Sequence, residues 1–469
     1  MTELRVWRSE MLKVYDWNKM SREEKRRLLR RAELDIDRFV EQVRPVVEGV
    51  RERGDKAVAE FTEKFDKVKL KPSDFKVRKS EFDEARKKVD AKVVAAIEEA
   101  VGNIRTYHER QMPQALWITP VREGVFAGEK ITPIASCGLY VPRGKGSFPS
   151  VMAMLGAPAV AAGVENLIVC TPPGPGGECD AATLVAARAC GVENVYRVGG
   201  AQSIAAMAYG TAKIPKMDKV IGPGSSYVAA AKRILFGVVD VGVPAGPSES
   251  IILADKTTDP DIAAADLLIE QEHGPDSTAL LVTDSEALIR EVSKRMPALV
   301  KRLPEPRRTF ATRGLGAEGF GGAVLTRNLA QSIAFVNEFA PEHLEVLVFD
   351  PVEAVNGIKN AGEILIGPDT PITLGNFNLG IDAILPTGGF ARTFSCVSVF
   401  DFLKRTSIGY ATPSGFDALA PGALTLANYE GFPAHAQAVK IRMEARKAEK
   451  ARAKAAKKMA SPKKTGKKK

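Results

Sequence analysis

Cysteine is scarce in this chain of 469 residues, which contains five of them. The number is odd, and no two cysteines stand in a Cys-x-x-Cys pair. Disulfide frameworks and thiolate zinc sites are built from even sets or close pairs of cysteine. The sequence therefore indicates neither kind of site. The five residues are Cys137, Cys170, Cys179, Cys190 and Cys396.

Long apolar runs are also lacking. The longest one, residues 151–164, contains Gly156 and Pro158 and is shorter than the roughly 20 residues that a membrane-spanning helix needs. The N-terminal stretch MTELRVWRSEMLKVYDW carries charges where a signal peptide would need its apolar segment. We therefore expect a cytoplasmic protein with no membrane partner.

The chain has no Walker sequence, so a nucleotide cofactor cannot be assigned from a phosphate-binding motif of that kind. The composition is typical of a globular protein of mixed secondary structure, with 45% hydrophobic and 7% aromatic residues. A chain of this length exceeds what one hydrophobic core usually serves. We therefore expect two or more domains.

The net positive charge of the chain comes from its C-terminal end. Residues 447–469 contain eleven Lys and Arg side chains and one acid, Glu449, which accounts for the whole net charge of +10. The rest of the chain is formally neutral, unlike a groove built to hold nucleic acid. We expect a disordered tail, whose contact with nucleic acid is limited to weak electrostatic attraction.

The hydrophobic pattern changes along the chain. Residues 20 to about 101 combine many charges with apolar side chains at helical spacing, which predicts a mainly helical segment. We expect His108, which follows it, to be a surface or capping residue without a role. From Ile134, short β-branched runs end in glycine loops and lead into small-residue helices, which predicts parallel βαβ units with ligand loops at the carboxyl ends of the strands. The four runs are 134–140, 166–170, 194–198 and 219–221.

A second α/β segment follows. It has expected strands at 250–254, 278–282 and 345–349 and expected helices at about 259–272 and 329–338. Two such units in tandem could be a duplicated fold, although no residue-level repeat is visible. The predicted fold class is α/β with parallel sheets, followed after about Phe402 by short helices and a long Ala, Lys and Arg helix.

Two acid-histidine pairs could carry chemistry. Glu270 and His273 are three residues apart at a predicted helix end, just before a Gly-Pro stop, and this spacing is a common start of a zinc site. Glu342 and His343 follow Pro341 and open a predicted strand. An imidazole suits proton removal from an alcohol, and a neighbouring carboxylate can activate water. The alternative for both pairs is a set of plain surface residues.

The sequence also resembles the histidinol dehydrogenase family from about Tyr15 to Met443. Nine blocks agree with the family in order and spacing. They are AEFTEKFD (59–66), GLYVPRG (138–144), VGGAQSIAA (198–206), GPGSSYV (222–228), PAGPSE (244–249), EHGPDS (272–277), PEHLE (341–345), ILPTGG (384–389) and PAHAQAVKIR (433–442).

This resemblance implies a homodimer of intertwined chains, with one zinc ion per subunit and NAD as the cofactor. The activity that it implies is oxidation of an amino alcohol to a carboxylate through an aldehyde, L-histidinol to L-histidine, the last step of histidine biosynthesis. It also implies two Rossmann-like domains. The expected domains are an N-terminal helical segment (1–30), a zinc and catalytic domain (31–136 with 250–395), an NAD-binding domain (137–249), a C-terminal helical dimerisation domain (396–446) and the tail (447–469).

The resemblance assigns a role to particular side chains. His343 matches the general base, and Glu342 matches the residue that activates water in the second oxidation. The implied zinc ligands are Glu270, His273, Asn376 and, from the other subunit, His435. The implied substrate contacts are Ser248, Glu270, His273, His343 and Glu430. The implied NAD contacts are Tyr140, Gln202 and Ser225.

The chain departs from the family at several of these positions. The family's zinc-binding glutamine and aspartate are Glu270 and Asn376 here. Either change alone would alter the charge of the site by one unit, but together they still leave one carboxylate and one amide, so the metal should still bind. Ser225 replaces an NAD-binding asparagine. Ala383 replaces a substrate-contacting histidine, and losing such a hydrogen bond can cost about 1–3 kcal/mol.

Three functional hypotheses remain open from the sequence. The first is a zinc- and NAD-dependent histidinol dehydrogenase. The second is a related enzyme for a different hydroxyl substrate, including an anionic one, because Arg143 and Lys145 place two cations in a loop that could receive a carboxylate, sulfonate or phosphate. These two cations could also simply face solvent. The third is a non-catalytic relative whose basic tail binds an acidic partner.

Overall fold

The computed structural model describes residues 12–30, 36–143, 146–242, 246–316 and 319–460. The chain divides into two compact units. We call residues 1–112 with 133–403 the main unit, and residues 113–132 with 404–469 the small unit. No helix among the described residues is both long and apolar enough to cross a membrane.

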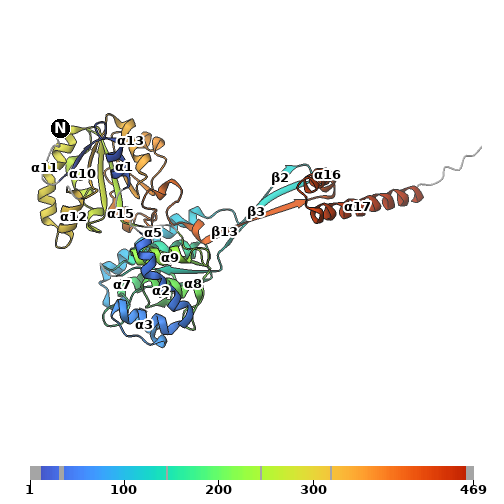
Figure 1. The fold of residues 1–469 in the computed structure, drawn as a ribbon, viewed down its shortest axis with the longest axis horizontal. Coiled ribbons are helices and arrows are strands. Elements are labelled where there is room, and N and C mark those ends of the chain that lie inside the picture. The colour runs from blue at the N-terminus through green and yellow to red at the C-terminus, as the bar shows by residue number, and fades with distance from the viewer. Residues whose placement is uncertain (1–11, 31–35, 144–145, 243–245, 317–318, 461–469) are drawn as a thin grey trace, which may run out of the picture. The chain divides into compact units, whose positions relative to one another are not determined.

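The main unit contains a six-stranded parallel sheet. Helices cover both of its faces (Figure 1), and three of its central strands are buried along their whole length, as expected for a parallel sheet. Its strands, in spatial order, are β1 (Val14–Asp16), β10 (Gly322–Leu325), β9 (Thr278–Thr283), β8 (Glu249–Ala254), β11 (His343–Leu347) and β12 (Glu363–Ile366).

Side-chain alternation along the strands builds two cores. In β8, Ile252 and Ala254 pack against one set of helices, while Ile251 and Leu253 pack against the other, because successive residues of a strand face opposite sides. The first set is α10 (Pro260–Asp266), α11 (Glu286–Arg302) and α12 (Arg307–Leu315). The second is α1 (Arg22–Arg30), α13 (Leu329–Phe339) and α14 (Pro351–Gly357).

A second parallel sheet of four strands also belongs to the main unit. Its spatial order is β6 (Val195–Tyr196), β5 (Asn166–Cys170), β4 (Ser136–Tyr140) and β7 (Lys219–Ile221). Without the edge strand β1, the larger sheet has the order 3-2-1-4-5 when its strands are numbered along the chain, and the four-stranded sheet has the order 3-2-1-4. Both orders are typical of Rossmann-like folds. The α/β class is therefore confirmed, and the shared order supports the idea of a duplicated fold. The connecting helices are α6 (Pro149–Ala161), α7 (Ala181–Cys190), α8 (Gly200–Tyr209) and α9 (Ser226–Leu235).

The N-terminal segment differs from the expected grouping. Residues 31–136 were expected to join residues 250–395, but the described helices of this segment pack on the helices of the four-stranded sheet. Their apolar faces fill the two cores of that sheet, so the burial of those faces decides where they pack. They are α2 (Ile36–Arg53), α3 (Asp55–Asp66), α4 (Lys79–Lys88) and α5 (Ala91–Gln111). Residues 14–16 are not helical, because they add the edge strand β1 to the larger sheet.

The expectation for His108 was wrong. This residue of α5 has no exposed surface, and its Nδ1 atom lies 2.8 Å from the backbone oxygen of Ile104. Its Nε2 atom lies 3.9 Å from Oδ2 of Asp382, which is buried as well. His108 is therefore an interior residue that links α5 to the segment before Ile384.

The small unit contains an antiparallel hairpin that the sequence pattern did not predict. Strands β2 (Leu116–Arg122) and β3 (Val125–Pro133) pair antiparallel, and β13 (Leu403–Ala411) lies beside β3. All of β2 is exposed, so it lacks the buried alternation that reveals a strand in a sequence. Helices α16 (Pro413–Tyr429) and α17 (Pro433–Ala460) complete the unit.

The expected disordered tail is helical over much of its length. Helix α17 includes residues 447–460, whereas 461–469 lie outside the described residues. The carboxylate of Asp417 on α16 accepts hydrogen bonds from Arg446 and Lys450 of α17. These bonds fasten the two helices together and continue into the basic segment. The short elements not yet given are the 3-10 turns Pro72–Asp74, Glu270–Glu272, Phe390–Arg392 and Val399–Phe402 and the helix α15 (Ile372–Phe377).

We expect the His108→Gln variant to lose part of the acid sensitivity of the wild type. Burial lowers the pKa of His108 from its ordinary value of 6.5. Below that pH the unfolded chain binds a proton that the folded chain does not, so the stability contributed by neutral His108 is present above pH 6.5 and is lost as the pH falls. The loss can reach about 1.4 kcal/mol per pH unit.

Urea unfolding at several pH values between 7 and 5 measures this effect. The free energy of unfolding should fall more steeply with acidification in the wild type than in His108→Gln. Equal slopes for the two proteins would show that folding does not change the proton affinity of His108.

Candidate active site

Three parallel strands of the larger sheet begin side by side, and their first residues bring acids and an imidazole together. In the register of the sheet, His343 of β11 lies between Ser250 of β8 and Glu363 of β12. Side chains at matching positions of neighbouring strands point to the same face. The predicted pair Glu342 and His343 therefore lies at the amino-terminal edge of the sheet, next to residues from both neighbouring strands.

The turn after α13 directs the pair inward. Ala340 has a φ of 54°, in the left-handed region that costs a residue with a side chain roughly 1–2 kcal/mol, and Pro341 then prevents the helix from continuing. The Glu342 carboxylate accepts a hydrogen bond of 2.8 Å from the backbone nitrogen of Glu249. Glu342 is 8% exposed and His343 is 3% exposed, so neither is the solvent-facing residue of the alternative interpretation.

Glu270 and His273 approach this pair from a separate element. They lie on a 3-10 turn after α10 and not on the end of one long helix, and residues three apart in such a turn lie above one another. Glu270 is fully buried. Its Oε2 atom is 2.8 Å from Nδ1 of His273, and its Oε1 atom is 3.9 Å from Nε2 of His343. The hydroxyl of Ser248 is 2.8 Å from Nδ1 of His273.

Helix α15 adds Asn376 to the group. The amide nitrogen of Asn376 lies 3.3 Å from Oε1 of Glu270, to which it donates a hydrogen bond. The start of α15 is fixed by a buried acid of β11, because the backbone nitrogen of Ile372 donates to Glu345. Burial and the neighbouring Asp266 carboxylate raise the pKa of Glu345 to about 9. A protonated Glu345 thus anchors the helix without adding another negative charge.

Carboxylates surround the imidazole of His343. Its Nδ1 atom is hydrogen-bonded to Oε1 of Glu363, and its Nε2 atom lies 3.8 Å from Oε1 of Glu342. Burial favours the neutral ring, but Glu270, Glu342 and Glu363 outweigh it and raise the pKa of His343 to about 10. The three carboxylates therefore stabilise the protonated ring, which must lose this proton before Nε2 can act as a base.

The pKa values of the two acids that face His343 are shifted in opposite directions. Burial opposes ionisation of Glu270, yet His343, His273 and Asn376 lower its pKa to about 2. For Glu342, burial and the charges of Glu270 and Glu249 raise the pKa well above its ordinary value, although His343 opposes this. One site therefore contains a carboxylate that stays ionised and a second one that holds a proton readily, which suits acid-base work.

The grouped side chains fit a divalent cation. Oε2 of Glu270 is buried, and Nδ1 of His273 lies 2.8 Å from it. A carboxylate oxygen and an imidazole nitrogen placed in this way can both face one ion. No group of three or more His, Cys, Asp or Glu residues in the described chain could hold a metal. The predicted set is not such a group in the main unit, since it includes the amide of Asn376 and takes His435 from another chain.

Two of the predicted NAD contacts lie at the carboxyl edge of the four-stranded sheet. Tyr140 ends β4, and its hydroxyl accepts a hydrogen bond of 3.3 Å from the backbone nitrogen of Gly200 at the start of α8. Gln202 is buried, and its amide nitrogen donates to Asp66 at 3.2 Å. The Oε1 atom of Gln202 is buried without a hydrogen bond, so it has an acceptor to offer.

The third predicted contact, Ser225, follows β7 across the point where the strand order reverses. It is exposed and occupies the N-cap position of α9 without making a capping bond through its side chain. Gly222 comes close to β4, since a Cβ there would lie 2.1 Å from the backbone oxygen of Tyr140. The switch point of an open α/β sheet is where folds of this kind bind dinucleotides.

The two cations proposed for an anionic substrate are not placed alike. Arg143 is hydrogen-bonded to the backbone oxygen of Glu178 at 3.0 Å and lies 3.4 Å from its carboxylate. Its charge is therefore already paired. Lys145 lies outside the described residues. Ala383 is half-buried and packs against the core of the four-stranded sheet.

The remaining predicted residues belong to the small unit. Glu430 ends α16, and His435 lies in the first turn of α17. Both are exposed, and the ring of His435 lies 5.1 Å from that of Phe432. Both side chains are thus on the surface of the small unit.

Sequence reasoning missed two acids that support the predicted residues. Glu363 contacts His343, and Asp66 holds Gln202. Burial raises the pKa of Asp66 to about 6, although its hydrogen bond to Gln202 opposes this. The signal for Glu363 was its place as the first residue of an apolar strand, Glu-Ile-Leu-Ile, where an acid is unusual. Asp66 ends the matched block 59–66, but no hydrophobic pattern marked it as a buried residue.

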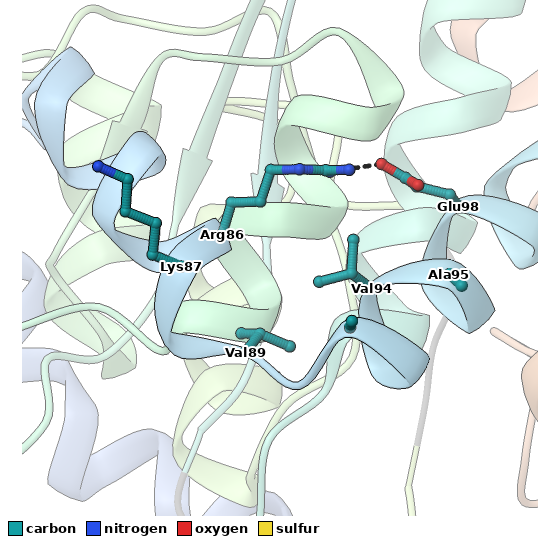
Figure 2. Close-up of a pocket in the computed structure, with 7 residues that line it drawn as sticks. Arg86, Lys87, Val89, Val94, Ala95 and Glu98 are labelled. Carbon is teal, nitrogen blue, oxygen red and sulfur yellow. Dashed lines mark hydrogen bonds and ion pairs between the residues drawn. The ribbon is translucent and has the colours of Figure 1, made fainter.

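A hollow of about 540 Å³ lies between α4 and α5 (Figure 2). Arg86 and Glu98 form an ion pair of 2.5 Å across it, above aliphatic side chains that include Val89 and Val94. None of the predicted site residues lines this hollow. Its residues are Arg86, Lys87, Val89, Ala91, Val94, Ala95 and Glu98.

Comparison with known proteins agrees with this arrangement. The sequence model of the family "Histidinol dehydrogenase" matches residues 29–443. A histidinol dehydrogenase homolog of Rhizobium meliloti (strain 1021) is 51% identical over 425 residues, which are 91% of this chain and 93% of the relative. The histidinol dehydrogenase of Synechocystis sp. (strain ATCC 27184 / PCC 6803 / Kazusa) is 48% identical over 432 residues, 92% of this chain and 99% of the relative.

The structural comparison agrees as well. The crystal structure of histidinol dehydrogenase from Elizabethkingia anophelis matches with a TM-score of 0.86 and 33% identity, and the match covers 92% of this chain and 98% of that one. The resemblance predicted from the sequence blocks is thereby confirmed. The chain belongs to the histidinol dehydrogenase family of oxidoreductases.

Proposed function

We propose that the protein is a zinc- and NAD-dependent dehydrogenase that oxidises an amino alcohol through an aldehyde to the carboxylate, with L-histidinol as the first candidate substrate. The observation that carries this proposal is the grouping of Glu342, His343, Glu270, His273 and Asn376 at one sheet edge. When bound, zinc would supply a positive charge that holds a substrate nitrogen or oxygen, and NAD would supply the hydride acceptor.

His343 is the proposed base of the first step. Its Nε2 atom faces into the group of acids and accepts the hydroxyl proton as the hydride leaves the carbinol carbon. Glu270, His273 and Asn376 are the metal-holding side chains on the main unit. Ser248 touches His273 and lies at the same edge, where it can contact the substrate.

Glu342 is proposed to act in the second step. It lies 3.8 Å from His343 and is buried, so a water molecule beside it would be activated away from bulk solvent. Proton transfer from that water to Glu342 gives the oxygen that adds to the aldehyde carbon. Loss of the second hydride to a second NAD molecule, and of the remaining hydroxyl proton, would then leave the carboxylate.

The nature of the substrate follows from the charges in the site. The acids around His343 favour a substrate with an ammonium group and disfavour an anion, and Arg143 is already paired with Glu178. A different hydroxyl substrate stays the second candidate, because Ala383 stands where the family has a substrate-contacting histidine. Growth of a histidine auxotroph on this gene separates the two, since only a histidinol-oxidising enzyme restores growth.

We also propose that the active site is shared between the subunits of a homodimer. Glu430 and His435 are exposed on the small unit, as side chains donated to another chain would be. The same unit exposes several large apolar residues, which suit burial in an interface. They include Leu116, Ile118, Val121, Leu426 and Phe432.

We expect the His343→Asn variant to lose most of its turnover. Removing a general base commonly costs about a hundred- to ten-thousandfold in rate, whereas the binding of NAD should not change. NADH formation with histidinol, together with calorimetric titration of NAD, measures both quantities. A turnover equal to that of the wild type would remove His343 from the mechanism.

Zinc retention should depend on the pair Glu270 and Asn376 as a unit. We expect Glu270→Gln to weaken zinc binding by more than the roughly ten- to hundredfold that loss of an outer contact costs. The double variant Glu270→Gln with Asn376→Asp should recover most of this loss, because it restores one carboxylate and one amide. Zinc content after dialysis against graded chelator gives the result without any activity assay.

The matched control is Glu272→Gln, an equivalent change in the same turn. It should retain zinc like the wild type. Equal zinc retention by Glu270→Gln and Glu272→Gln would contradict the proposed ligand set.

A mixed dimer tests the shared site. The His343→Asn and His435→Asn chains are given different tags and co-expressed, and the heterodimer is purified. In one of its two sites, the intact His343 of one chain meets the intact His435 of the other. The heterodimer should therefore show about half of the wild-type turnover while each parent homodimer is nearly inactive. A heterodimer as inactive as its parents would place both histidines in a site made by a single chain.

A further inference from the structure

Glu363 is a buried acid in direct contact with the proposed base. Its side chain is 4% exposed, and its Oε1 atom is hydrogen-bonded to Nδ1 of His343. The two residues face each other in the register of β12 and β11. Nothing in the family resemblance gives this residue a role.

The backbone holds Glu363 rigidly beside His343. The backbone nitrogen of Glu363 donates to the backbone oxygen of Glu342 at 3.0 Å, and that of Gly362 donates to Pro341 at 2.9 Å. The start of β12 is thus fastened to the turn that carries the catalytic pair. The acid cannot shift along the strand without breaking these bonds.

The surroundings leave room for this carboxylate and give it few other partners. A Cβ added to Gly375 would lie 3.1 Å from Oε2 of Glu363 and 3.3 Å from its Oε1, so a larger residue at 375 would crowd it. Oε2 is buried and makes no hydrogen bond. Burying a carboxylate in this way costs stability. Its contact with His343 is therefore the feature that needs a functional explanation.

We propose that Glu363 is a positioning residue for His343. It accepts the hydrogen of Nδ1, which fixes the ring orientation and leaves Nε2 as the nitrogen that faces Glu270 and Glu342 at 3.9 and 3.8 Å. A carboxylate that holds the far nitrogen of a catalytic imidazole is a general device for selecting tautomer and direction. This inference rests on the proposed role of His343 as the base.

The first test is a double-mutant cycle in the zinc-loaded, full-length protein. We expect Glu363→Gln to lower kcat by about ten- to a hundredfold with little change in KM, zinc content or melting temperature. In the His343→Asn background the same change should have no further effect, because Glu363 acts only through that ring. Equal losses in both backgrounds would show that Glu363 supports the fold and not the histidine.

The second test does not depend on turnover. The chain contains only four histidines, so ¹⁵N-labelled histidine gives a simple ring-proton spectrum. The wild type should show a far-downfield Nδ1–H resonance that disappears in His343→Asn and moves or disappears in Glu363→Gln. A Glu363→Ala variant serves the same purpose where Glu363→Gln is poorly folded.

The outcomes separate this inference from the proposed function. If the wild type and His343→Asn were equally active, the proposed function would fail while the spectrum could still show the Glu363 contact. If His343→Asn were inactive but Glu363→Gln kept the wild-type kcat and an unchanged resonance, the function would stand and the role of Glu363 would be rejected.

Discussion

The in-register pairing of β8, β11 and β12 is the constraint on which the candidate site depends. It places Ser250, His343 and Glu363 at matching positions of three adjacent strands. A shift of β11 by one residue would turn His343 to the opposite face of the sheet. The apolar residues that follow fix this register, because Leu344 and Val346 pack into the same buried core as Ile251 and Leu253. The core thus aligns the chemistry at the strand ends.

This arrangement costs stability. Glu270, Glu345 and Glu363 are all buried within one region, and such groups are buried only when paired or functional. The structure limits the cost by pairing Glu270 and Glu363 with histidines and by raising the pKa of Glu345. The left-handed backbone of Ala340 adds to this cost in stability. The concentration of unfavourable features at one edge is itself a sign of function.

The sequence predicted what is local and missed what is distant along the chain. The βαβ pattern and the pairs Glu270–His273 and Glu342–His343 were visible because their residues lie within a few positions of each other. The contacts of His343 with Glu363, of Gln202 with Asp66 and of His108 with Asp382 join residues 20, 136 and 274 positions apart. The hydrophobic periodicity of a sequence cannot predict contacts between such distant residues. The exposed β2 was missed for the opposite reason, since no burial pattern marks it.

Helix ends give opposite electrostatic polarity to one edge of each sheet in the main unit. At the carboxyl edge of the four-stranded sheet, α8 and α9 begin, and helix N-termini attract the negative charge of a dinucleotide. At the amino edge of the six-stranded sheet, α13 ends just before Glu342, and helix C-termini attract cations.

The acids at the amino edge of the six-stranded sheet attract positive charge, as the C-terminal end of α13 does. Glu270, Glu342 and Glu363 all lie within 3.9 Å of the His343 ring, so their negative charges would attract a metal ion or a substrate ammonium group and repel a sulfonate or phosphate. The proposal of a cationic amino alcohol beside a divalent metal therefore rests on the polarity of the fold as well as on the identity of single residues.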